Sequence, residues 1–352
     1  MARSAETDRS SGALTKDLLM TSQIVSSFEP KASSRRDAPV FVLGAVRSGT
    51  TLLYHMLLSS GNFAVYRTES NALNLLEPRF GDLSRHRNQR RLLDAWYKSR
   101  LFSLSGVEKS VIEARVMAEC RHGGDFLRIV MEEIARRQGV KRWADTTPEH
   151  LLHLKRIKQT IPNALIIHVI RDGRDVALSA DKLGWVRRLP WDRTPSVIVA
   201  GLYWQWMVNK GRAAGRQLGN DYIEVRFEDM IAQPQATLRK LGEFVDHDLD
   251  YDRIQKVGVG SVGAPNTSFP AEDFEPVGRW RKGYAATELA ALESLIGGTL
   301  EKLGYTLATD ESERSAGSRD RLMYQAYFDS KLYLKTKTPL GRWFTTRDLS
   351  WI

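Results

Sequence analysis

The sequence predicts an α/β fold, a three-layer sandwich in which helices flank a central parallel sheet. The first observation behind this prediction is the apolar run at residues 40–43, which is followed by a glycine-containing loop and a helical pattern. The second is an apolar, β-branched run at residues 164–170. Runs that are apolar throughout are typical of strands buried on both faces, as in parallel sheets.

Strand and helix patterns alternate along the rest of the chain, which favours βαβ units. Further strands are expected at 63–66, 142–145 and 222–227. Helical periodicity predicts helices over 86–101, 107–119, 124–138, 149–160, 174–182, 196–218, 234–246 and 286–303.

Composition divides the chain into four parts. Residues 1–38 are serine-rich and mixed in charge, and we expect a flexible N-terminal tail. The α/β domain is expected over residues 39–307, and residues 308–320 form a polar linker. The last part, 321–352, carries seven aromatic and six basic residues, which predicts an arm that packs on its own domain or on a second copy in a homo-oligomer.

The chain is basic. It has 52 Lys and Arg against 42 Asp and Glu, a net charge of +10, which suits an anionic partner such as a nucleotide, a nucleic acid, a membrane surface or an acidic substrate. Its single cysteine, Cys120, excludes an intramolecular disulfide. The sequence shows neither a transmembrane run nor a signal peptide, so we expect a cytoplasmic protein.

The loop after the first strand, Gly44–Thr51, has the sequence GAVRSGTT. Such a strand–loop–helix can cradle a phosphate on backbone N–H groups at the helix N-terminus, although an ordinary turn is the alternative. Two glycines and the final hydroxyl fit the P-loop pattern, but Thr50 stands where that pattern has lysine. The nearby cation is Arg47. The fold is therefore expected to be P-loop-like, with one 5′-phosphate-type group in the loop rather than a magnesium triphosphate.

A second basic motif follows the strand at 164–170. Arg171 lies at the carboxyl end of this strand, where open parallel sheets bind ligands, and Ser179 lies about two helical turns further on. The two side chains could bind a second phosphate. The alternative is a capped helix with a surface arginine.

Together these motifs resemble the sulfotransferase family that uses 3′-phosphoadenosine 5′-phosphosulfate (PAPS), in its bacterial or tyrosylprotein-type layout. The resemblance covers roughly residues 39–305. It implies that the RSGTT run binds the 5′-phosphosulfate and that the Arg…Ser pair binds the 3′-phosphate. A VRFEDM segment and a late GRW segment are similar to family segments beside the adenine and over the cofactor. The implied cofactor-binding residues are Arg47, Ser48, Gly49, Thr50, Thr51, Arg171, Ser179, Phe227 and Arg279.

The resemblance implies transfer of a sulfuryl group from PAPS to a hydroxyl or amine by in-line displacement, with adenosine 3′,5′-bisphosphate as product and no metal required. Arg47 would stabilise the leaving phosphate, and Glu69, after the expected second strand, is the first candidate for general base. Glu69 could instead pair with Arg67 or cap a helix. Either His122 or His150 is a reserve base. The sequence departs from the family at Thr146, where a lysine is frequent.

Two other functions stay open at this point. One is a nucleotide or sugar kinase with a degenerate P-loop, and the other is a non-catalytic basic protein that binds a nucleotide, a nucleic acid or a membrane. The basic residues are spread along the chain and no nucleic-acid motif occurs, so nucleic acid is not expected. The acceptor class is open among small molecules, carbohydrates, lipids and peptides. The basic stretch at 79–100 is either a solvated helix face or a lid for an anionic acceptor.

Overall fold

The computed structural model describes residues 35–184, 186, 188–189, 191–257, 275–310, 312 and 318–345. The chain divides into two units, Met1–Ser34 and Arg35–Ile352, and the described residues all belong to the second. Most of the expected N-terminal tail therefore lies outside the described residues.

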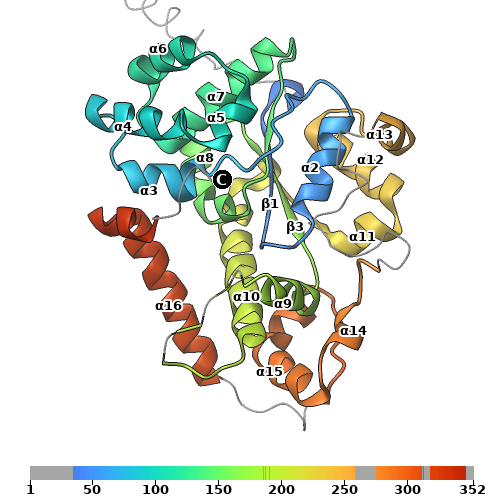
Figure 1. Ribbon diagram of the computed structural model, residues 1–352. Coiled ribbons are helices and arrows are strands. Elements are labelled where there is room, and N and C mark those ends of the chain that lie inside the picture. Colours follow the sequence, from blue (N-terminus) through green and yellow to red (C-terminus); the bar gives the residue numbers. More distant parts are fainter. Residues whose placement is uncertain are drawn as a thin grey trace, which may run out of the picture. The chain divides into compact units, whose positions relative to one another are not determined.

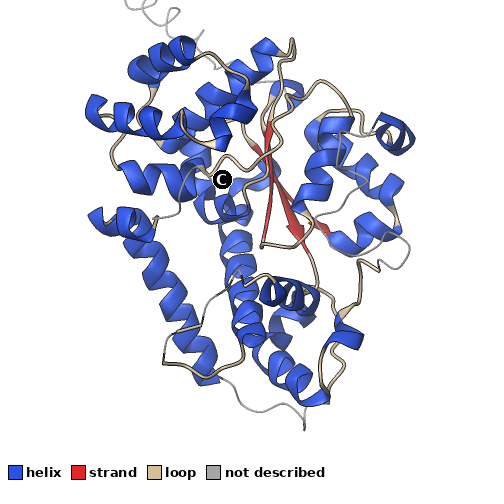
Figure 2. Cartoon of the chain, in the orientation of Figure 1, coloured by secondary structure: helices blue, strands red, loops and turns tan. Residues whose placement is uncertain are grey.

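The centre of this unit is a parallel four-stranded sheet, which Figure 2 shows in red. Its strands are β1 (Val40–Gly44), β2 (Ala144–Asp145), β3 (Leu165–Ile170) and β4 (Tyr222–Arg226), in the order β2-β1-β3-β4. Val40 pairs with Leu165 and Ile166 with Tyr222, so β1, β3 and β4 are in continuous register. All four carboxyl ends consequently meet at one edge.

The prediction of a strand at residues 63–66 is wrong. Only Phe63 pairs with the sheet, through a single parallel bridge to Arg142. The reason is visible at Val65, whose N–H donates to Gln138 Oε1 at 2.7 Å and whose carbonyl accepts from Gln138 Nε2 at 3.0 Å. The side-chain amide of Gln138 thus makes the hydrogen bonds to Val65 that a neighbouring strand would otherwise make.

The strands bury both faces, as the apolar runs predicted. Alternate residues of β1 and β3 enter two separate cores. Phe41, Leu43 and Ile166 belong to one core, and Val42 and Ile167 to the other. This alternation confirms the three-layer sandwich.

The smaller core is covered by α2 (Thr50–Ser59), α11 (Phe227–Ala232), α12 (Pro234–Val245) and α13 (Tyr251–Val257). The larger core is covered mainly by α7 (Gly123–Arg137), α8 (Leu154–Thr160), α9 (Gly173–Lys182), α10 (Ser196–Gly215) and α15 (Ala286–Lys302). Figure 1 shows the two groups on either side of the sheet. The remaining elements are η1 (Arg35–Asp37), η2 (Ala72–Leu76), α3 (Glu77–Phe80), α4 (His86–Trp96), α5 (Arg100–Ser105), α6 (Lys109–Glu119), η3 (Pro148–His153), η4 (Arg216–Asp221), α14 (Trp280–Gly283), α16 (Ser318–Lys337) and η8 (Pro339–Phe344).

Two expected helices are divided. The helix expected at 86–101 ends at Trp96, because Ser99 starts a new helix by accepting a hydrogen bond from the Phe102 N–H at 3.3 Å. The helix expected at 149–160 begins as the 3₁₀ turn η3 and becomes α-helical only at Leu154.

The C-terminal arm contains the long helix α16, which lies beside α10 (Figure 1). Tyr324 and Phe328 are buried in the larger core. Asp329 accepts a hydrogen bond from Trp206 Nε1 at 2.9 Å and pairs with Lys210 at 2.9 Å. The arm therefore packs on its own chain, and its use in a homo-oligomer stays a prediction. Among the described helices, none is long and apolar enough to cross a bilayer.

Candidate active site

The loop between β1 and α2 has a backbone that only certain residues allow. Arg47 and Gly49 have φ angles of 69° and 93°, in the left-handed region. A Cβ at Gly49 would lie 2.2 Å from the ring of Phe227, so glycine is required for the loop to rest against this ring. Helix α2 starts at Thr50, and the N–H groups of Thr50 and Thr51 have no acceptor within the helix. They remain available to an anion.

The loop and the second basic motif meet. Arg47 Nε donates to Ser179 Oγ at 3.0 Å, and Arg171 Nη1 donates to the Arg47 carbonyl at 3.0 Å. The sequence suggested two separate phosphate sites, and the structure brings their residues into one continuous group. We call Arg47, Arg171, Ser179 and Arg279 the phosphate corner, after the group that the sequence predicts they bind.

Arg171 is the most enclosed cation of the phosphate corner, with 8% of its surface exposed. Its Nη2 donates to the Pro276 carbonyl at 2.6 Å, and its guanidinium lies 4.6 Å from the centre of the Phe227 ring. Burial lowers the pKa of Arg171, although Asp175, 3.8 Å away, opposes that shift. Its Nε is buried and has no hydrogen-bond partner among the described residues.

Arg279 reaches the corner on a segment that Asp175 holds in place. The Asp175 carboxylate accepts the N–H groups of Gly278 and Trp280, both at 2.8 Å. The guanidinium of Arg174 stacks on Trp280 at 3.6 Å from the ring centre. Sequence analysis missed Asp175. The signal was its place in the RDGRD run, one helical turn after Arg171.

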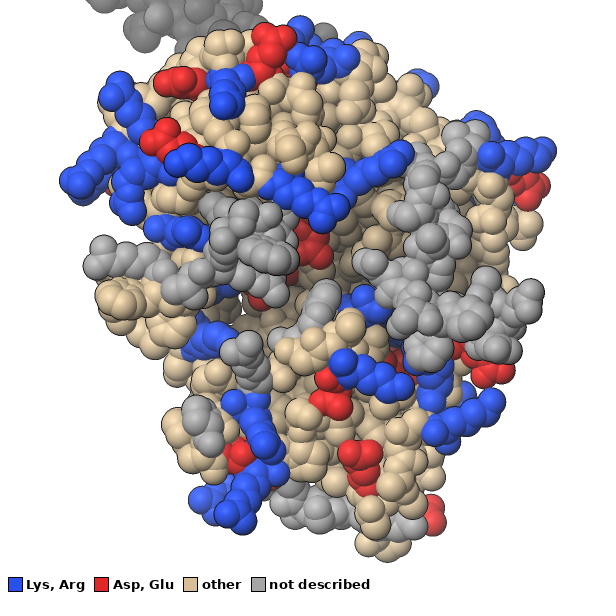
Figure 3. Space-filling model, viewed as in Figure 1, with Lys and Arg blue, Asp and Glu red and all other residues tan. Residues whose placement is uncertain are grey.

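The phosphate corner carries an excess of positive charge. Burial and the charge of Arg279 lower the pKa of Arg47, and the charges of Arg279 and Arg47 act on Arg171 in the same direction. Arginine stays protonated despite such shifts, so three cations remain close together. Figure 3 shows Lys and Arg side chains along the rim of a hollow in this face. An anion with several charges would relieve the repulsion.

Glu69 lies in the loop that leads from the Phe63 bridge to η2, and it is partly exposed. Its carbonyl accepts from Asn71 Nδ2 at 3.2 Å, and Asn71 itself has a left-handed φ of 53°. Ser70 Oγ lies 3.2 Å from Thr147 Oγ1, which also accepts from the Asn71 N–H at 3.3 Å. The loop is thereby fixed to the segment that follows β2.

That segment contains a buried network that the sequence did not reveal. Asp145 accepts from the Thr147 N–H at 3.1 Å and contacts His150 Nδ1 at 2.9 Å, while His150 Nε2 accepts from the Leu73 N–H at 3.2 Å. Both ring nitrogens are therefore occupied, so His150 is a structural link between η2 and η3 and not a reserve base. Burial alone would raise the pKa of Asp145, but the hydrogen bonds and His150 hold it below its ordinary value.

Thr146, the departure from the expected lysine, is also buried. Its Oγ1 has no hydrogen-bond partner among the described residues. The chain thus offers a small hydroxyl where the resemblance implied a long cation.

Comparisons with known proteins identify the fold and the family. Two solved structures share the fold: the sulfotransferase domain from the Synechococcus PCC 7002 olefin synthase (TM-score 0.50, 22% identity, 76% of this chain and 95% of that one) and the sulfotransferase domain from the curacin biosynthetic pathway (TM-score 0.52, 16% identity, 77% and 98%). No curated protein gives a significant match. The model of the sulfotransferase family matches residues 39–251, more than half of the 352 residues. The chain therefore belongs to the sulfotransferase family.

Proposed function

We propose that this sulfotransferase-family chain moves a sulfuryl group from PAPS to a hydroxyl or amine acceptor. The observation that carries the proposal is the phosphate corner, where Arg47, Arg171 and Arg279 converge beside the glycine loop. A donor with phosphate groups on the 3′ and 5′ positions of its ribose would compensate the positive charge of this corner.

The residues present fit such a donor. Ser48 Oγ is buried in the loop without a partner among the described residues, and Arg171 Nε is in the same condition. Buried polar atoms that the protein does not satisfy point to a bound group. Because Gly49 has no Cβ, the Phe227 ring packs directly against the loop.

The loop would hold the 5′ end of the donor. Arg47 and the N–H groups of Thr50 and Thr51 would donate to it, and the Ser48 hydroxyl would gain a partner. The donor supplies a sulfuryl group carried on a phosphate leaving group. Arg47 would stabilise the charge that the leaving oxygen gains as its bond to sulfur breaks.

The 3′ end would be held by Arg171, Ser179 and Arg279. In the structure Ser179 accepts from Arg47, so its hydroxyl proton remains available to a phosphate oxygen. Phe227 would position the adenine side, because its ring lies under the Arg171 guanidinium and against the loop.

Glu69 would act as general base. As the acceptor oxygen or nitrogen forms its bond to sulfur, the Glu69 carboxylate would take the acceptor proton. The anchoring of Ser70 and Asn71 on Thr147 keeps this loop at the carboxyl edge of the sheet, where the phosphate corner also lies.

A transfer experiment with two labels tests the proposal. Purified protein is incubated with ³⁵S-labelled PAPS, or with γ-³²P-labelled Mg-ATP, and a panel of phenols, sugars, alcohols and peptides. We expect ³⁵S in an acceptor and adenosine 3′,5′-bisphosphate as product. Transfer of ³²P alone would establish a kinase instead. Transfer of neither label by a protein that fails to bind the bisphosphate would favour the non-catalytic alternative.

A further inference from the structure

We propose that a pocket between α10, α16 and η3 binds an aromatic ring of the acceptor, so that the acceptor is an aryl compound with its reactive hydroxyl directed to the Glu69 loop. This inference rests on the proposed function, since it names the substrate class of the same site. The residues that form the pocket wall include Tyr203, Trp206, Tyr327, Phe328, Glu149 and Lys335.

Four of the ten residues that line the pocket are aromatic, and the others are aliphatic or charged. Tyr203 and Phe328 meet edge to face with ring centres 5.2 Å apart, Trp206 and Phe328 lie at 5.4 Å, and Tyr327 and Phe328 also lie at 5.4 Å. Rings that already contact one another at tilted and edge-on angles leave faces and edges on which a further ring can pack. The pocket volume is about 120 Å³. An enclosed apolar cavity of about 150 Å³ accepts benzene, so this smaller, partly open pocket has room for no more than one ring.

One end of the pocket is polar. Glu149 Oε2 accepts from Lys335 Nζ at 3.0 Å, and the Glu149 side chain keeps 35% of its surface accessible. Burial alone would raise the pKa of Glu149, but Lys335 and Asn74 hold it below its ordinary value. An ionised, partly accessible carboxylate can accept a hydrogen bond from a ring substituent.

The same carboxylate connects the pocket to residues 64–71, the loop that carries Glu69, which we call the base loop. Asn74 Nδ2 donates to Glu149 Oε2 at 3.2 Å and to Asn71 Oδ1 at 3.0 Å, and Asn71 Nδ2 in turn donates to the Glu69 carbonyl. A continuous chain of hydrogen bonds therefore runs from Lys335 on α16 to the backbone of Glu69. The C-terminal helix supplies one wall of the pocket and, through Glu149, supports the loop that carries the base.

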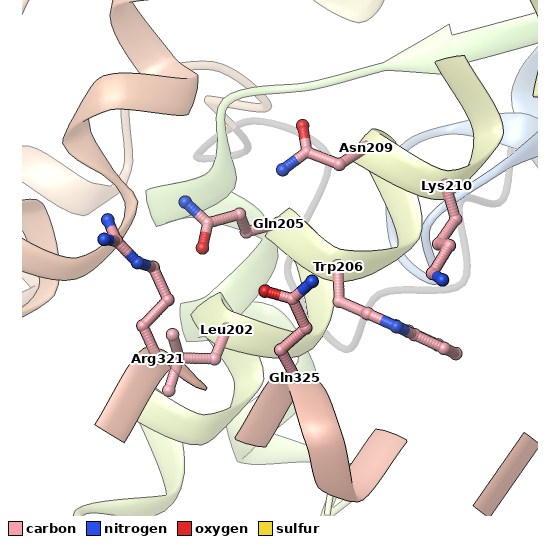
Figure 4. A pocket seen from close by; sticks show the side chains of 7 residues that line it. All are labelled: Leu202, Gln205, Trp206, Asn209, Lys210, Arg321 and Gln325. Carbon is pink, nitrogen blue, oxygen red and sulfur yellow. The ribbon is translucent and has the colours of Figure 1, made fainter. Parts of the chain in front are cut away.

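A neighbouring pocket on the α10–α16 contact has different chemistry. It is lined mainly by polar side chains, among them Gln205, Asn209, Lys210 and Gln325 (Figure 4). Gln205 Nε2 donates hydrogen bonds to the Leu295 carbonyl at 3.2 Å and to Thr299 Oγ1 at 3.0 Å. This pocket lacks the stacked rings of the first, so it is not the aromatic subsite.

The test compares a ring with its saturated counterpart. Binding of 4-ethylphenol and of 4-ethylcyclohexanol is measured by ligand-observed NMR, with and without adenosine 3′,5′-bisphosphate. Tyr327→Ala removes one wall at a half-buried position, and Leu332→Phe fills the pocket from the same helix. Tyr333→Ala is the matched control, because Tyr333 lies on α16 outside the pocket and is 61% exposed.

We expect 4-ethylphenol to bind more tightly than 4-ethylcyclohexanol. Tyr327→Ala should weaken phenol binding roughly 3- to 10-fold, the effect of one aromatic contact. Leu332→Phe should weaken it as well, and Tyr333→Ala should leave it unchanged. Equal binding of the two compounds, absence of phenol binding, or unchanged binding in both pocket variants would overturn the proposal. Phenol binding by a protein that does not bind the bisphosphate would refute the proposed function, and with it the acceptor role of the pocket.

Discussion

The phosphate corner and the base loop occupy the same edge of the sheet but are built in opposite ways. The corner brings Arg47, Arg171 and Arg279 together, and burial and mutual repulsion lower the pKa values of Arg47 and Arg171. In the residues that support the base loop, each buried or partly buried carboxylate has hydrogen-bond partners. Asp145 is hydrogen-bonded to His150 and Thr147, and Glu149 to Lys335. The phosphate corner has an excess of positive charge, whereas the carboxylates that support the base loop are paired within the protein. We therefore expect separate substitutions to disrupt the proposed donor binding and the proposed acceptor activation.

The largest separation is expected for Glu69→Gln. This variant keeps the size of the side chain and removes its ability to take a proton, so kcat should fall by roughly 10²- to 10⁴-fold. Binding of adenosine 3′,5′-bisphosphate should stay at the wild-type level in calorimetry. Normal turnover would show that another group is the base.

Arg171→Ala attacks the other region. Loss of a buried cation that is proposed to bind the 3′-phosphate should weaken bisphosphate binding by about a hundredfold or more, close to 3 kcal/mol. Calorimetric titration measures the effect. Arg216→Ala controls for net charge, because Arg216 is exposed on η4 outside the corner. Equal losses in the two variants would mean that binding follows overall charge alone.

Asp145→Asn tests whether the base loop depends on the buried network. The pKa of Asp145 is depressed in the folded state, so its contribution to stability is complete above the unfolded pKa of about 3.9 and is lost as pH falls through the folded value. At pH 7 the variant should lose about 2 kcal/mol of unfolding free energy. The difference from wild type should shrink below about pH 4 in denaturant titrations. A difference independent of pH would contradict the assignment.

Asp175→Asn should give the smallest effect. It replaces one of the two acceptors that hold Gly278 and Trp280, so Arg279 should be less well positioned and bisphosphate affinity should fall about fivefold, near 1 kcal/mol. The loss should be much smaller in an Arg279→Ala background if Asp175 acts through Arg279. Asp181→Asn on the same helix is the control. Additive losses in the double variant would give Asp175 a direct role.

Local patterns were sufficient for much of the fold. The apolar runs predicted β1 and β3, and the glycine loop predicted the turn into α2, because these signals lie within a few consecutive residues. The strand at 63–66 failed for a tertiary reason, since Gln138 occupies the hydrogen-bonding groups of Val65.

The residues of the candidate site were likewise predictable from local motifs, but their long-range contacts were not. The two sequence motifs predicted Arg47, Arg171 and Ser179 as site residues. Neither motif alone indicated that Arg47 donates a hydrogen bond to Ser179. The roles of His150 and Glu149 depend on partners more than 70 residues away, Leu73 for His150 and Asn74 for Glu149. Spacing along the chain carries no trace of such pairings.

The proposed role of the phosphate corner is tested by comparing two nucleotides that differ only in the 3′-phosphate. Wild-type protein and Arg171→Ala are titrated calorimetrically with adenosine 3′,5′-bisphosphate and with adenosine 5′-monophosphate. We predict that the wild type binds the bisphosphate at least a hundredfold more tightly, about 3 kcal/mol, and that Arg171→Ala nearly abolishes this preference. Equal binding of the two nucleotides by the wild type would contradict the account of the phosphate corner.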